Sequence, residues 1–135
     1  SLADCCYAGM FENSGLVHAP ALPATTLAVN CYGGHVTNSY SSYNLSGMFQ
    51  GCQSLLDAPV LPAETLVDGC YDSMFLNCPL ISEVECHATD ISAKDCTRSW
   101  LYGVAAEGTF HKAAAMDAWT EGASGIPAGW SVSDL

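Results

Sequence analysis

Cysteine is the residue type that could do the most chemistry here, since eight of the 135 residues are cysteines. A zinc site would need Cys-x-x-Cys pairs or histidines three to five residues apart beside them, and neither occurs. The cysteines instead recur at two places in a repeated pattern: Cys6, Cys31, Cys70 and Cys96 share one, and Cys52 and Cys78 share the other. Because an unpaired cysteine behaves as a small buried hydrophobe, we expect ladders of free thiols more than disulfides. Cys5 and Cys86 fall outside both ladders and are the thiols expected to react.

A nucleophilic site could be built from Cys86 and His87, with Glu85 beside them. A catalytic Cys–His pair must meet in space and needs a third group to orient it, and sequence neighbours do not guarantee this. The simpler interpretation is that His87 is an exposed residue at the end of a strand. Gly-x-Ser-x-Gly, phosphate-binding and dinucleotide motifs are absent. We therefore predict no catalytic residue, no metal and no cofactor.

Carboxylates form the next candidate group. Asp57, Glu83 and Glu85 fall in equivalent segments of neighbouring repeats, close to the place that His18 holds in the first. Together they predict an acidic strip on a strand face, which could bind a cationic partner, a divalent ion or sugar hydroxyls. The alternative is a solvated face that keeps the protein soluble and protects a sheet edge. No Asp-x-Asp-x-Asp-Gly loop supports a calcium site.

An insertion at 33–46 is the other candidate binding region, because it is rich in Tyr, Ser, Gly and Asn. That composition is typical of adaptable recognition loops, in which tyrosine gives contact area at low entropic cost. Insertions in repeat proteins emerge as loops on one face. We predict a binding loop here, although a solvated loop whose tyrosines fold back is the alternative. The residues expected to bind are His35, Asn38, Tyr40, Tyr43 and Asn44.

The elements that must position these residues are set by an internal repeat. Similar stretches begin at Leu2, Leu27, Leu66 and Ile91, so the first and third steps are 25 residues long. A period near 25 lies within the range of roughly 20–29 residues that leucine-rich repeats use. Within a repeat, 55–61 reads as a strand that ends at Pro62. The spacing of apolar residues over 65–75 predicts a short helix or 3₁₀ turn, with Thr65 as its N-cap.

The segment Met48-Phe49-Gln50-Gly51-Cys52-Gln53-Ser54-Leu55 resembles the motif of BspA-like leucine-rich-repeat proteins of bacterial surfaces. The resemblance covers nearly the whole chain, and its C-terminal part looks like the segment that closes such arrays. It implies an α/β repeat solenoid: right-handed coils with short parallel strands and helical or 3₁₀ returns. We expect coils over 1–96 and a capping segment over 97–135. A secreted or cell-surface location is implied as well, although no secretory signal opens this sequence.

Charge limits the function further. Three Lys and Arg residues stand against 14 Asp and Glu residues, which gives a formal net charge of −11. Such a chain repels nucleic acid and anionic lipid, and no apolar run is long enough to span a membrane. We therefore expect a non-enzymatic interaction module that binds a surface protein or a glycan in the manner of an adhesin. The alternatives are a structural spacer in a surface or phage fibre and, less favoured, a cysteine-dependent hydrolase.

Overall fold

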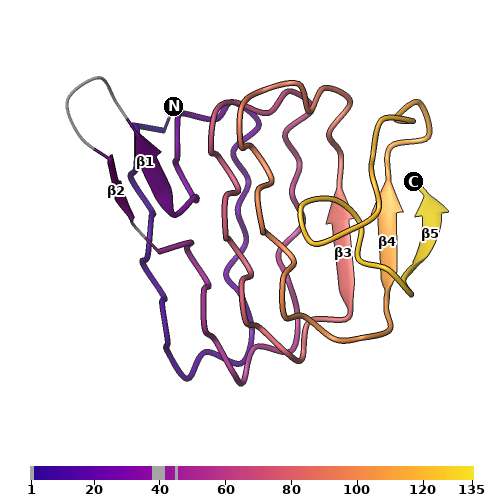
Figure 1. The fold of residues 1–135 in the computed structure, drawn as a ribbon, viewed down its shortest axis with the longest axis horizontal. Coiled ribbons are helices and arrows are strands. Elements are labelled where there is room, and N and C mark those ends of the chain that lie inside the picture. The colour runs from indigo at the N-terminus through magenta and orange to yellow at the C-terminus, as the bar shows by residue number, and fades with distance from the viewer. Residues whose placement is uncertain (1, 38–41, 45) are drawn as a thin grey trace.

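The computed structural model describes residues 2–37, 42–44 and 46–135, which follow a path of stacked passes (Figure 1). Five short strands occur in the described part: β1 (His35–Thr37), β2 (Ser42–Asn44), β3 (Glu83–Cys86), β4 (Thr109–Lys112) and β5 (Ser131–Asp134). β1 and β2 form an antiparallel hairpin, while β3, β4 and β5 form a parallel sheet in that order. Everything else in the described residues consists of turns, bends, isolated bridges and extended chain.

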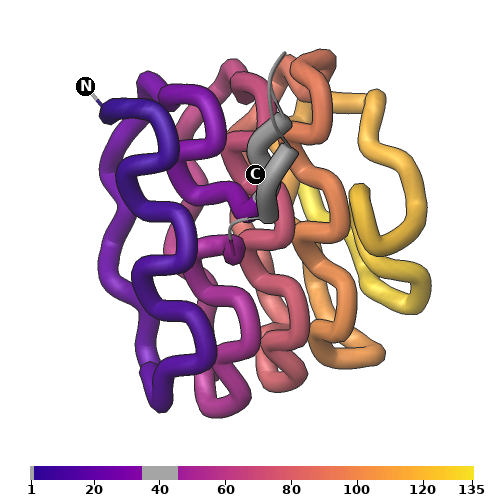
Figure 2. Tube along the Cα trace, turned by 60° about the vertical axis from the view of Figure 1, so that its left-hand side comes forward, coloured from indigo at the N-terminus to yellow at the C-terminus, as the bar shows by residue number. Residues whose placement is uncertain are grey.

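Each repeat has a turn side and an extended side. The turn side consists of linked turns, for example over 68–77 and 94–103, in which an N–H donates to the carbonyl three residues earlier. Alternate N–H groups point along the stack instead: Tyr71 donates to the Cys96 carbonyl and Ser73 to the Arg98 carbonyl. The extended side runs through 16–27, 55–66 and 81–92 and contains β3. Successive passes therefore hold each other by main-chain hydrogen bonds, and Figure 2 shows them side by side.

The predicted fold class, an α/β leucine-rich-repeat-like solenoid with helical or 3₁₀ returns, is wrong. No helix occurs among the described residues, and the only parallel strands there are the three of one small sheet, so the chain is a small compact domain. The helix predicted over 65–75 fails because Gly69 and Ser73 both have positive φ, near 60°, which an α-helix does not admit. The strand predicted over 55–61 is reduced to isolated bridges at Asp57 and Leu61, where prolines interrupt the ladder.

What the sequence repeat does preserve is the register of equivalent side chains. Rings from successive repeats lie nearly parallel, with centroids 5.4–6.1 Å apart. The two stacks are Tyr7–Tyr32–Tyr71–Trp100–Trp119 and Phe11–Phe49–Phe75. The thiols of Cys52 and Cys78 donate to the carbonyls of Phe11 and Phe49 across 3.0 and 2.9 Å. All eight cysteines are free, in agreement with the predicted thiol ladders.

The insertion leaves the turn side and contains a hairpin, β1 and β2, where a loop was expected. Two glycines form its base because the third repeat packs directly against them. A Cβ on Gly33 would lie 1.7 Å from the Gly69 carbonyl oxygen, and one on Gly47 would lie 2.0 Å from that of Ser73. Since Met48 donates to the Tyr32 carbonyl, the stack continues past the hairpin without a break.

Residues after 97 continue the same core. Trp100 is fully buried and stacks on Trp119, with ring centroids 5.4 Å apart. Its indole N–H donates to the Gly125 carbonyl, and that of Trp130 donates to the Ala105 carbonyl, both across 2.8 Å. This segment adds β4 and β5 to β3 and thereby forms most of the sheet.

Candidate functional site

The extended side carries three pairs of an imidazole and a carboxylate. His18 Nδ1 lies 3.2 Å from Asp57 Oδ1, so this pair joins the first repeat to the second. His111 Nε2 lies 3.1 Å from Glu83 Oε1, which joins β4 to β3. Within β3 and the residue after it, His87 Nε2 lies 2.8 Å from Glu85 Oε1. The four strand-face residues predicted from the sequence all take part in these pairs. They are His18, Asp57, Glu83 and Glu85.

Alternation along the strands explains why these groups face outward. In β3, Val84 and Cys86 are buried whereas Glu83 is exposed and Glu85 partly so. Because β3 and β4 are parallel and in register, Phe110 is buried beside Val84, and His111 follows Glu85 outward. Successive side chains of a strand point to opposite faces, so one face is core and the other is available to solvent. The acidic strip is therefore built into the sheet.

In the described residues, the arginine and lysine side chains that pair with carboxylates pair with ones outside the strip. Arg98 Nε lies 3.0 Å from Oδ2 of the fully buried Asp72, and Lys112 Nζ lies 2.8 Å from Asp134 Oδ1. The three carboxylates of the strip therefore have imidazoles, and not lysine or arginine, as their side-chain partners in the described residues.

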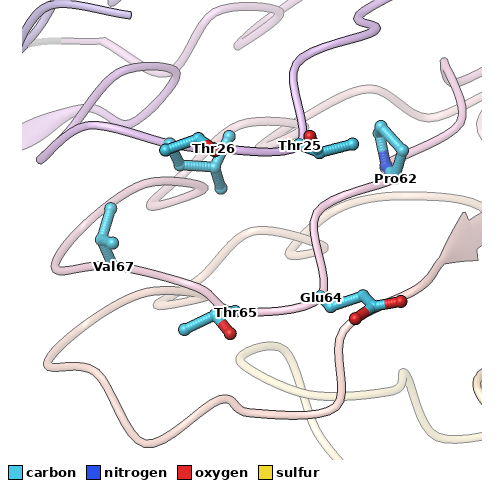
Figure 3. Close-up of a pocket in the computed structure, with 7 residues that line it drawn as sticks. Thr25, Thr26, Pro62, Glu64, Thr65 and Val67 are labelled. Carbon is cyan, nitrogen blue, oxygen red and sulfur yellow. The ribbon is translucent and has the colours of Figure 1, made fainter. Parts of the chain in front are cut away.

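Two hollows open between the segment 20–27 and the segment 59–67, and we call them together the inter-unit groove. The larger, of about 450 Å³, is lined by Thr25, Thr26, Leu27, Pro62, Glu64, Thr65 and Val67. Figure 3 shows the segment that carries Thr25 and Thr26 running opposite the segment that carries Glu64 and Thr65. The smaller, of about 260 Å³, is lined by Ala21, Leu22, Pro23, Val60 and Pro62. The two share Pro62, and both belong to the extended side.

The groove has an acidic end. Glu64 is exposed at its wall, and Asp90 forms a parallel bridge with Thr65 in the neighbouring repeat. The hydroxyl of Ser92 donates to the Asp90 carboxylate across 2.7 Å and its N–H does so across 3.0 Å. These two hydrogen bonds lower the pKa of Asp90, so its charge persists in mildly acidic solution.

The structure separates the other predicted binding region from this site. His35 lies in β1, and Tyr43 and Asn44 lie in β2, in a hairpin that leaves the turn side. Asn38 and Tyr40 lie outside the described residues. The insertion and the strand face are therefore two distinct candidate regions.

The expectation about the reactive thiols is wrong for Cys86. That residue is fully buried on the inner face of β3, and burial raises the pKa of its thiol to about 12. His87 lies outside and pairs with Glu85, so the pair is not arranged for nucleophilic attack, which needs a thiolate. The exposed thiol is Cys6, which the repeat had placed at the end of a ladder. Cys5 is half-buried, and burial raises the pKa of its thiol.

Within the described ranges, no three His, Cys, Asp or Glu residues are grouped so that they could hold a metal ion. No helix long and apolar enough to cross a membrane occurs in that part of the chain. No protein-family model matches the sequence, and comparisons with curated proteins and with solved structures gave no significant match.

The inter-unit groove was not expected from the sequence. The feature of the sequence that could have indicated the groove is the repeated spacing of prolines. Pro20 and Pro23 lie in one repeat, and Pro59 and Pro62 lie in the next. Proline has no N–H, so two proline-bearing segments side by side cannot complete a hydrogen-bonded ladder. In the third repeat Val84 and His87 stand at these places, and there the extended segments do pair.

Proposed function

We propose that this chain is a non-enzymatic binding module that takes a positively charged polypeptide on its extended side. The observation that supports this most is the set of three carboxylates, Asp57, Glu83 and Glu85, each oriented by an imidazole on one side of the molecule. A secreted or cell-surface location fits this role, and that part of the proposal rests on the resemblance to bacterial surface repeats.

Charge supports a cationic partner over a neutral one. The chain carries a formal net charge of −11, so approach of a basic polypeptide is favoured over the whole surface and most strongly where carboxylates gather. Complementary potentials of this kind speed association and select partners more than they add affinity. A basic polypeptide on the extended side would meet Asp57 in one repeat and Glu83 and Glu85 further along the stack.

The test compares two variants that lose equal charge. One carries D57N, E83Q and E85Q, and the control carries E12Q, E107Q and D117N, three exposed carboxylates with no imidazole partner in the described residues. A labelled ten-residue oligolysine serves as the probe, and its Kd is measured at about 0.02 M and about 0.2 M salt. We expect the first variant to bind about tenfold more weakly than the control, which corresponds to about 1.4 kcal/mol.

Equal Kd values for the two variants would contradict the proposal, because attraction would then come from net charge alone. Absence of binding by the unmodified protein at low salt would contradict it as well, and would favour a structural spacer instead. Circular dichroism and urea unfolding of both variants show whether the fold is intact, which separates loss of binding from loss of structure.

A further inference from the structure

We infer that the inter-unit groove is the place on the extended side that receives the main chain of a basic peptide in extended conformation. This inference rests on the proposed function, because it names the class of partner and the position it occupies. It is carried by an observation that the proposed function does not use: several main-chain N–H and carbonyl groups of the groove walls have no hydrogen-bond partner within the described structure.

The junction between the second and third repeats shows what a closed junction looks like. Leu61 donates to the Glu85 carbonyl and accepts from the His87 N–H, across 3.0 and 2.9 Å. Further along, the Glu64 carbonyl accepts from Thr89 and Asp90, and Leu66 donates to the Asp90 carbonyl. These contacts close the gap between the segments 59–67 and 83–91 from end to end.

The junction between the first and second repeats lacks the equivalent contacts. His18 and Asp57 form a parallel bridge, which puts Leu22 opposite Leu61 and Thr26 opposite Thr65. Pro62 occupies the place of His87 and has no N–H to donate to the Leu22 carbonyl. Among the described residues, no main-chain hydrogen bond joins the segment 20–27 to the segment 59–67.

Specific donors and acceptors are left for a ligand. The N–H groups of Leu27, Glu64 and Thr65 donate to no atom in the described part of the chain, and the carbonyls of Leu22 and Thr25 accept from none. The residues that carry these groups line the two hollows from both segments. An extended peptide satisfies such groups by main-chain hydrogen bonds, which is how proteins add a strand to an open edge.

Size and lining suit a peptide with alternating side chains. A hollow of about 450 Å³ lies within the range of roughly 300–1,000 Å³ that ligand sites have. Pro62 and Val67 give apolar contact, and Val60, at 47% exposure, extends that surface into the smaller hollow. Thr25, Thr26 and Thr65 add hydroxyls that can donate or accept.

Charge selects the basic residue of the peptide. Glu64 lines the larger hollow, and its carboxylate has no ion-pair or hydrogen-bond partner in the described residues. A lysine or arginine side chain at this end would pair with Glu64. A neutral or acidic peptide would leave this carboxylate unpaired, so it is the weaker ligand.

The experiment uses the whole protein and three synthetic peptides with blocked ends. The first has the sequence Thr-Val-Lys-Val-Thr-Val, the second is the same peptide methylated on alternate main-chain nitrogens, and the third has glutamine in place of lysine. Titration calorimetry gives each Kd. We expect the second and third peptides each to bind about tenfold more weakly than the first. The second lacks main-chain N–H donors, and the third lacks the cation that pairs with Glu64.

Two variants of the groove and one control complete the design. T26F places a ring in the larger hollow, E64Q removes the carboxylate, and E12Q removes an equal charge from the turn side. We expect T26F and E64Q each to weaken binding of the first peptide about tenfold while E12Q leaves it unchanged. Urea unfolding confirms that each variant is folded.

Equal binding of the first and methylated peptides would overturn the inference, as would binding that T26F leaves intact. If the variant with D57N, E83Q and E85Q loses oligolysine while the groove variants keep the first peptide, the proposed function stands and this inference fails. If the first peptide does not bind but oligolysine does, the groove is again excluded as the peptide site.

Discussion

Pro62 and His87 occupy equivalent places in neighbouring repeats, but only His87 has an N–H, and it donates to the Leu61 carbonyl across 2.9 Å. This difference is one of those that distinguish the closed junction from the open one. Where the donor is present, the extended segments pair along their length. Where proline replaces it, the segments form the walls of a groove.

Replacing His87 with proline should open the second junction in the same way. H87P removes the donor and leaves the Leu61 carbonyl without it, so we expect the free energy of unfolding to fall by about 1–3 kcal/mol. H87A is the matched control, because it keeps the N–H and removes only the imidazole, whose partner Glu85 is partly exposed. Urea unfolding measures both. A loss in H87A as large as that in H87P would show that the side chain, and not the N–H, holds the junction.

Gly69 should tolerate no side chain. Its φ is +62°, and a Cβ there would lie 1.8 Å from Asn30 Oδ1. G69A should therefore lower the free energy of unfolding by about 1–3 kcal/mol. Gly15, where a Cβ would meet nothing within 4 Å, is the control, and G15A should stay within about 0.5 kcal/mol of the unmodified protein. Equal stability of the two variants in urea would contradict the assigned backbone conformation.

Thiol labelling should follow burial and not the position of a cysteine in the repeat. In the native protein, iodoacetamide should modify Cys6 first and Cys5 more slowly, because burial raises the pKa of the Cys5 thiol. The six buried cysteines should react only after unfolding. Peptide mass mapping of samples taken over time tests this. Early modification of Cys86 would revive the hydrolase hypothesis, and C6S checks the assignment of the first site.

Alkaline solution should destabilise the fold. Burial raises the pKa of Cys31 to about 11 and that of Cys78 to about 12, from the ordinary value of 9.0. A group whose pKa is raised on folding stabilises fully below its unfolded pKa, and this contribution is lost as the pH rises toward the folded value. We therefore expect the free energy of unfolding to be constant up to about pH 8 and to fall between about pH 9 and about pH 11. C31A should reduce that fall, and a profile flat through this window would contradict the burial of these thiols.

The sequence predicted the repeat register but not the local structure that carries it. Equivalent aromatic residues such as Tyr32 and Tyr71 do stack, because a conserved spacing brings equivalent places together. The returns were expected to be helical because apolar spacing over 65–75 resembles a helix stripe. The competing indication was Gly69 and Asn77, two residue types that tolerate positive φ, spaced eight residues apart. Ser73, halfway between them, also takes positive φ, which its residue type does not predict.

The candidate site was predictable only in part. Alternation along 83–86 places the carboxylates Glu83 and Glu85 outward, and the repeat brings His18 beside Asp57, so the strip could be derived. His111 could not be assigned, because its pairing with Glu83 depends on β4 joining the sheet from beyond the repeats. The groove exists because main-chain hydrogen bonds between 20–27 and 59–67 are not formed in the described structure. A repeat pattern predicts which residues lie opposite each other, but not whether their main chains pair.

The most direct test of the account is an NMR titration of the ¹⁵N-labelled protein with the blocked peptide Thr-Val-Lys-Val-Thr-Val. We expect the amide shifts to change along both groove walls, at 20–27 and 59–67, and next along 83–87, while amides of the turn side at 68–77 stay in place. Changes concentrated in the insertion at 33–46 or on the turn side, with the groove walls unmoved, would contradict the claim that the extended side is the binding surface.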